Sequence, residues 1–300
     1  MSDLSLPTMP VISQVGHVAM RVKDIERSLF TAKNIMGLRE VAREGDSVLL
    51  TNGRLHHTIE YIASDEDAVD HIGLVAANSA ALSEVRRRVE VGGFTVISES
   101  PLDPGIEDGF AFIGPEGFVY EIYRGMGSDN PLYIPTGVQP TRFGHINIYS
   151  KDPVATTRFL TEVLDFRLSD KMEDDGGFFL RCNVDHHGIA VMTGNGVLHH
   201  HAWEVQSIAD LSRLGDCLDA NGEYLIWGPV RHGIGRNIAA YFVEPSGTVV
   251  EFYTDMERIY DEDTFEPGVW TRDNQRFYSF WTPMRNPSFT THGTPPASRR

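Results

Sequence analysis

The chain has little cysteine, little positive charge and no long apolar run. Only two of its 300 residues are cysteines, which favours a reducing, cytoplasmic environment. Lys and Arg number 26 against 42 Asp and Glu, and the formal net charge of −16 repels phosphate backbones and anionic lipid. No apolar run approaches the roughly 20 residues of a membrane span, and no charged-then-apolar leader precedes the first strand. We therefore expect neither nucleic acid nor a membrane as a partner.

One pattern of histidine and glutamate occurs twice in the sequence. The first copy is His17, His71 and Glu121, and the second is His145, His200 and Glu251. The offsets between the copies are 128, 129 and 130 residues. The intervening segments repeat as well, because Lys23-Asp24 and Lys151-Asp152 each open a stretch with helical apolar spacing. The sequence therefore contains an internal duplication, with Asp24 and Asp152 as predicted helix N-caps.

The duplication predicts two lobes. We place an N-terminal domain at residues 1–134 and a C-terminal catalytic domain at residues 135–300, joined by a proline-punctuated connection at residues 128–140. Residues 267–283, dense in aromatic side chains, are expected to form an arm over a cavity of the C-terminal domain or against a neighbouring subunit. Residues 287–300, rich in Pro, Ser and Thr, are expected to fray.

Strand alternation directs part of the second copy inward. His145 and Asn147 share one face of the strand FGHINIY. The Pro-Ser-Gly loop at residues 245–247 suits a three-residue hairpin that ends in a left-handed glycine. This hairpin places Tyr241 opposite Glu251, about 5 Å apart at Cβ. Two imidazoles and one carboxylate leave open coordination positions, an arrangement typical of non-haem Fe(II) oxygenases.

The motifs around these residues resemble those of the type I extradiol (meta-cleaving) catechol dioxygenases of the vicinal oxygen chelate superfamily. They are GHINIY at residues 144–149, LHHHAWEV at 198–205 and YFVEPSGTVVEFYT at 241–254. The resemblance extends from about Val15 to Trp281. It implies an α+β fold of four βαβββ modules, paired into two domains that each wrap a curved mixed sheet around a cavity. It also implies insertion of both atoms of O₂ into a catechol next to the diol, in a homo-oligomer for which we expect a tetramer.

Carried over position by position, the resemblance assigns the metal site to the second copy. His145, His200 and Glu251 match the ligands of Fe(II), or occasionally Mn(II), in that family. Up to three positions on the metal then remain for the two catechol oxygens and O₂. His199 and His201 flank the middle ligand, and strand alternation predicts that both point away from it.

Four further residues match the family's catalytic and binding residues. His187 matches its acid–base histidine, which is expected to donate a proton as the ring opens. His232 and Tyr241 match residues that hydrogen-bond the bound catechol or oxygen, and we expect them to aid catechol deprotonation. Asn147 matches a polar neighbour of the first ligand. Imidazole suits proton transfer because its usual pKa lies near neutrality.

The sequence departs from the branch of the family that acts on homoprotocatechuate. Arginines that help to hold a carboxylate in that branch correspond here to Trp227 and Phe277. We therefore expect a neutral alkyl or aryl substituent on the catechol, with Trp227 as a candidate substrate contact.

The first copy of the triad is expected to be an inherited remnant without catalysis and without metal. Its hairpin places Ala111, rather than a tyrosine, opposite Glu121. The segment at residues 104–110 is shorter and offers no counterpart to His232. A second metal site is chemically possible all the same, because both types of ligand are present.

Two other functions stay open at this point. A glyoxalase-like isomerase or epimerase would bind Zn, Ni or Co and leave O₂ untouched, although His187 and Tyr241 argue against it. A non-enzymatic, drug-sequestering protein of the bleomycin-resistance type would lack metal ligands. Oxygen uptake with catechol and ferrous iron separates the dioxygenase from both alternatives.

Overall fold

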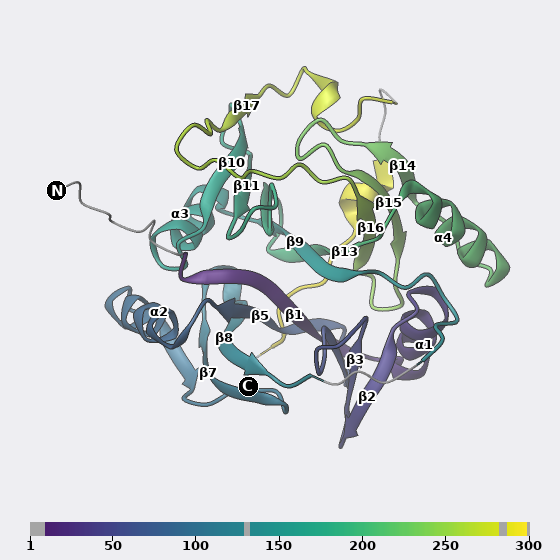
Figure 1. Cartoon of the computed structure of the whole chain (residues 1–300), viewed down its shortest axis with the longest axis horizontal. Coiled ribbons are helices and arrows are strands. Elements are labelled where there is room, and N and C mark those ends of the chain that lie inside the picture. The colour runs from purple at the N-terminus through teal and green to yellow at the C-terminus, as the bar shows by residue number, and fades with distance from the viewer. Residues whose placement is uncertain (1–9, 129–132, 282–286, 299–300) are drawn as a thin grey trace.

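The strands of each half of the chain form one curved, mixed sheet (Figure 1). The computed structural model describes residues 10–128, 133–281 and 287–298. The first sheet has the order β2 (Arg39–Glu44), β3 (Ser47–Thr51), β4 (Ile59–Ala63), β1 (Ile12–Val22), β5 (Ala68–Ala76), β8 (Val119–Met126), β7 (Ile106–Ile113), β6 (Thr95–Ser98). Its central strands β1 and β5 run antiparallel, whereas β1 pairs in parallel with β4 and β5 with β8.

The second sheet repeats this order and adds one strand. Its order is β10 (Arg167–Met172), β11 (Gly177–Arg181), β12 (Ile189–Thr193), β9 (Arg142–Ser150), β13 (Val197–Glu204), β16 (Val249–Thr254), β15 (Ile238–Val243), β14 (Trp227–Arg231). The additional strand β17 (Gly268–Trp270) pairs in parallel with β10 at the edge. The topology therefore confirms the predicted α+β fold of four βαβββ modules.

Each module contains one helix that packs its apolar side against the core. The helices are α1 (Ile25–Phe30), continued by the π-helical turn η1 (Thr31–Ile35), α2 (Ser79–Val91), α3 (Pro153–Glu162) and α4 (Ile208–Ala220). Asp24 and Asp152 cap α1 and α3 as predicted, since their carboxylates accept hydrogen bonds from backbone N–H groups three residues on. Within the described residues, the helices are too short or too polar to cross a membrane.

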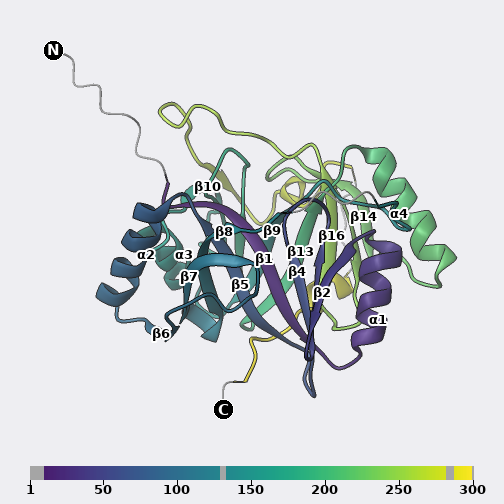
Figure 2. The same ribbon diagram turned by 60° about the horizontal axis from the view of Figure 1, so that its bottom comes forward.

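The two halves pack through helices at both ends of the molecule. Figures 1 and 2 show α2 beside α3 at one end and α1 beside α4 at the other. Phe159 of α3 places its ring 5.3 Å from that of Tyr120 in β8. Between the sheets, the Tyr61 hydroxyl donates a 2.6 Å hydrogen bond to Glu244, and both side chains are buried. The lobes therefore share one interior.

The C-terminal stretch is ordered against both lobes, so the expectation that it frays is wrong for residues 288–298. Thr294 exchanges two backbone hydrogen bonds with Leu198 in β13, and Ala297 donates one to Val69 in β5. These bonds satisfy strand groups that the sheets leave free, which composition alone cannot indicate. The short 3₁₀-helices η2 (Pro115–Gly117), η3 (Gln275–Phe277) and η4 (Pro287–Thr291) complete the fold. Pro131, residues 282 and 283 of the predicted arm, and residues 299 and 300 lie outside the described residues.

Candidate active site

Three neighbouring strands of the second sheet bring His145, His200 and Glu251 together. Ala202 of β13 is paired with His145 of β9 on one side and with Glu251 of β16 on the other. His145 Nε2 and His200 Nε2 each lie 3.2 Å from Glu251 Oε2. All three side chains are buried. The structure therefore aims three ligand atoms at one point, as the sequence predicted.

The spacing of these atoms fits a single metal ion. An ion bonded at about 2.1 Å to atoms at right angles separates those atoms by about 3 Å. The second oxygen of Glu251 accepts a 2.9 Å hydrogen bond from Asn237 Nδ2, which orients the carboxylate. Asn237 was not predicted, because it lies in an irregular loop before β15. The glycine of the Gly-His motif is also explained, since a Cβ at Gly144 would lie 2.0 Å from the hydroxyl of Tyr253.

A hydrogen-bonded chain fixes the ring of His200. His199 Nε2 donates a 2.7 Å bond to the carbonyl oxygen of Phe289, so its Nδ1 is free to accept. That Nδ1 lies 2.9 Å from His200 Nδ1, which must therefore donate. The lone pair of His200 is left on Nε2, facing Glu251. Phe289 thus selects the tautomer of His200 that binds a metal.

The orientation of His199 corrects one prediction. Its side chain lines the cavity instead of pointing away, because a β-bulge between Leu198 and His200 breaks the strand alternation. His201 does point away, as expected, and its Nε2 lies 3.3 Å from Glu244 Oε1. Phe289 was also missed, because it lies in the stretch that was expected to fray.

A cavity beside the triad contains every other predicted site residue. The lining includes Asn147, His187, Trp227, His232 and Tyr241 together with the three triad residues. Much of the remaining lining is apolar: Phe179, Ala190, Met192, Ile234, Phe277 and Phe289. The predicted arm contributes Phe277 and Tyr278 to this wall, whereas its strand β17 pairs with β10 at the edge of the sheet.

His232 and Tyr241 form one polar unit of the cavity wall. His232 Nδ1 donates to the carbonyl oxygen of Tyr278, so Nε2 accepts from the Tyr241 hydroxyl at 2.7 Å. Burial lowers the pKa of His232 and raises the pKa of Tyr241 well above its usual value. Both groups are therefore neutral, and the lone pairs of the Tyr241 oxygen are available to an incoming hydroxyl.

His187 lies beside His145 of the triad. Its ring centre is 4.4 Å from that of His145 and 5.4 Å from that of Phe179. Burial, together with the neighbouring histidines, lowers its pKa well below 6.5. The imidazole is therefore neutral at physiological pH and can accept a proton before it returns one. The sequence gives only the usual pKa of an imidazole and does not show how dry the site is.

Comparison with known proteins agrees with this geometry. Residues 142–252 match the family model of the Glyoxalase/Bleomycin resistance protein/Dioxygenase superfamily. The chain carries a domain of this superfamily. The range contains all three residues of the second triad, and the resemblance stated from the sequence motifs is confirmed.

Relatives and solved structures match nearly the whole chain. A manganese-dependent 2,3-dihydroxybiphenyl 1,2-dioxygenase from Geobacillus genomosp. 3 is 26% identical over 287 residues, 86% of this chain and 90% of that protein. A metapyrocatechase from Geobacillus stearothermophilus is also 26% identical, and the alignment covers 88% of this chain and 87% of that protein. Among solved structures, a Mn(II)-bound glyoxalase from Novosphingobium aromaticivorans has a TM-score of 0.86 at 27% identity, covering 97% of this chain and 96% of that one.

Proposed function

We propose that the protein is a metal-dependent extradiol dioxygenase, which inserts both atoms of O₂ into a catechol beside its two hydroxyls. The convergence of His145, His200 and Glu251 at the edge of an apolar cavity carries this proposal. We assign Fe(II) to the triad because two His and one carboxylate with open positions suit this ion. Mn(II) is the alternative, and it appears in the name of one relative. The bound ion would hold catechol and O₂ in contact and remove the spin barrier to their reaction.

The polar residues of the cavity supply the proton transfers. The Tyr241 oxygen accepts a hydrogen bond from a catechol hydroxyl, and His232 holds the phenol in that orientation. His187 takes up the proton that the catechol gives up on binding and returns it to the product as the ring opens. Asn147, next to His145 on the cavity wall, orients the substrate.

The cavity wall favours a catechol with a neutral alkyl or aryl substituent. Trp227 and Tyr241 stack with ring centres 5.2 Å apart, and Phe289 packs edge-on against both. Among the described residues that line the cavity, none is Lys or Arg. A carboxylated side chain would therefore lose its hydration without gaining a Lys or Arg partner.

A glyoxalase-like isomerase is the second candidate, because a structure named as a glyoxalase matches 97% of this chain. Such a reaction moves protons between carbon and oxygen and consumes no O₂. The neutral pair of His232 and Tyr241, which lines the same cavity as His187, fits a diol substrate better.

Oxygen consumption tests the proposal directly. The protein, loaded anaerobically with Fe(II), is given catechol, 3-methylcatechol, 2,3-dihydroxybiphenyl and homoprotocatechuate in an oxygen-electrode cell. We expect one O₂ per catechol, a yellow ring-opened product and a preference for the neutral substrates. Turnover of the glutathione adduct of methylglyoxal, with no O₂ uptake on any catechol, would establish the isomerase instead. If homoprotocatechuate were the best substrate, the substrate assignment would be wrong.

Cytoplasmic location and a homotetramer complete the proposal. The two cysteines are free in the structure, which fits a reducing compartment. Light scattering coupled to size exclusion would measure the number of subunits.

A further inference from the structure

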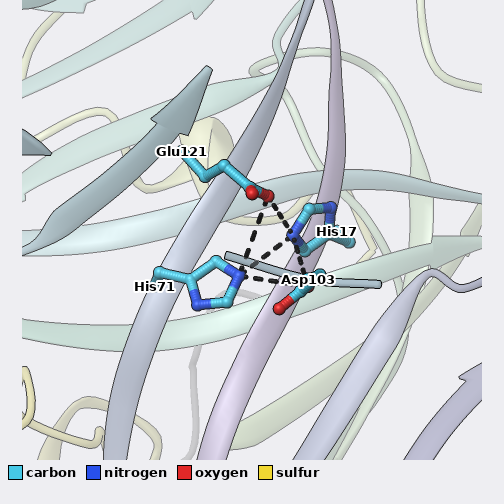
Figure 3. A group of neighbouring side chains, drawn as sticks. All are labelled: His17, His71, Asp103 and Glu121. Atoms are coloured by element: carbon cyan, nitrogen blue, oxygen red, sulfur yellow. Dashed lines mark hydrogen bonds and ion pairs between the residues drawn. The ribbon is translucent and has the colours of Figure 1, made fainter. Parts of the chain in front are cut away.

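The first lobe gathers four candidate ligands where the second lobe has three. Figure 3 shows His17, His71, Asp103 and Glu121 pointing toward one another. His17 Nε2 lies 3.2 Å from Asp103 Oδ2 and 3.2 Å from Glu121 Oε2. His71 Nε2 lies 3.2 Å from His17 Nε2 and from Asp103 Oδ2, and 3.9 Å from Glu121 Oε2. Four bonds of about 2.0–2.1 Å in a tetrahedron separate the ligand atoms by about 3.3 Å, which is close to this spacing.

Two of the four ligands, His71 and Glu121, are each oriented by a second hydrogen bond. Asp70 accepts from His71 Nδ1 at 3.0 Å, which leaves the lone pair of His71 on Nε2. Arg21 in turn holds Asp70. Glu121 accepts a 2.6 Å bond from the backbone N–H of Leu102. A carboxylate behind a histidine is the usual support of a metal ligand, and an unused remnant does not require it.

The buried charge of the site suits a cation. Asp103 and Glu121 are two buried carboxylates, 6% and 0% exposed. Within the described residues, their ion-pair partners are histidines and include no Lys or Arg. Two buried negative charges are costly unless they are neutralised, and one divalent ion between them balances both.

We propose that the first lobe binds a divalent transition-metal ion, for which zinc is the best fit, through His17, His71, Asp103 and Glu121. The site is structural, because four protein ligands complete the coordination and leave no position for a catechol and O₂. The expectation of a catalytically inactive first lobe is kept, and the expectation that it is empty of metal is replaced. Asp103 escaped the sequence analysis because it lies in the loop between β6 and β7, outside the duplicated motifs.

Metal counting on matched variants tests this inference. The protein is purified without added metal, dialysed against metal-free buffer, and its metals are measured by mass spectrometry. Wild type reloaded with Fe(II) and Zn²⁺ is expected to hold two ions per chain. His200→Ala is expected to keep one ion, in the first lobe. Asp103→Asn is expected to keep one ion, in the second lobe, and this ion supports catechol cleavage. Asp108→Asn removes an exposed carboxylate of the same lobe and is expected to keep two.

A single ion per chain in wild type that disappears in His200→Ala would overturn the inference, provided that circular dichroism shows a folded variant. Melting curves give a second readout. Zn²⁺ added to chelator-treated His200→Ala is expected to raise its melting temperature, and an unchanged temperature in His200→Ala would contradict a structural ion. Failure of the dioxygenase proposal is separate, because it concerns O₂ uptake by the other lobe.

Discussion

The two lobes carry the same triad on equivalent strands, yet the residues around the two sites differ. Tyr241 faces Glu251 across the hairpin in the second lobe, whereas Ala111 faces Glu121 in the first. The second difference is in the preceding loop. Ser98 pairs with Ala111 and Trp227 pairs with Tyr241, so Ser98 and Trp227 are equivalent positions. Asp103 lies five residues after Ser98, and His232 lies five residues after Trp227.

This second difference decides what each lobe can do. Asp103 reaches the ligand atoms of the first lobe and closes the set. His232 instead bonds to Tyr241 at the wall of an open cavity. One loop residue therefore separates a closed site, suited to stability, from an open site, suited to catalysis.

A glycine accommodates the more crowded site of the first lobe. Gly73 occupies the position between the first and third ligands that Ala202 occupies in the second lobe. A Cβ at Gly73 would lie 2.1 Å from the ring of His17. The duplicated strands have therefore adapted to different ring positions.

The largest expected effect comes from removing the middle ligand of each triad. His200→Ala is expected to abolish catechol cleavage, because the open triad loses one of its three ligands. His71→Ala, the matching change in the first lobe, is expected to leave cleavage at 25 °C and to lower the melting temperature. Oxygen-electrode rates and thermal melts measure both. Loss of cleavage in a folded, iron-loaded His71→Ala would show that the lobes do not act independently.

The acid–base residue is the next test. His187→Asn is expected to lower turnover by ~10²-fold or more while the iron content stays near that of wild type. The counterpart of His187 in the first lobe is His57, which contacts Asp103 and does not line the cavity. His57→Asn is therefore expected to leave turnover unchanged. Rates and iron content are measured on the same samples. A His187→Asn protein without iron would refute the proton-transfer role.

The tautomer relay behind His200 predicts a smaller effect. His199→Phe keeps a ring beside Tyr149 but cannot accept the proton of His200 Nδ1. We expect the affinity for Fe(II) to fall ~10–100-fold, as for other residues that support metal ligands. Competition with a chromophoric chelator measures the dissociation constant, and an unchanged value would show that the relay does not matter.

Removal of one hydroxyl is expected to have the smallest effect. Tyr241→Phe removes the hydroxyl that contacts the catechol. We expect the rate to fall about tenfold, because one neutral hydrogen bond is lost. The reciprocal change, Ala111→Tyr, is expected to give the first lobe no activity, because its metal has no open position. This is measured in the His200→Ala background, where any catechol cleavage would contradict a closed first site.

The sequence by itself determined the duplication, the helix caps, the hairpin register and the repeated pattern of two histidines and one glutamate. Each of these depends on residues close in the chain, or on a spacing that occurs twice, so periodicity and turn chemistry were sufficient. Tyr241 opposite Glu251 is an example, because the loop that ends in Gly247 sets the register.

Only the tertiary structure decided the roles of Asp103, His199 and Phe289. Asp103 reaches its site through the path of a loop, and His199 turns inward at a bulge. Phe289 comes from a tail that packs between the lobes and supplies a carbonyl oxygen to His199. Loop paths and tail packing depend on long-range contacts and on backbone groups that need partners, and these leave no local pattern in the sequence.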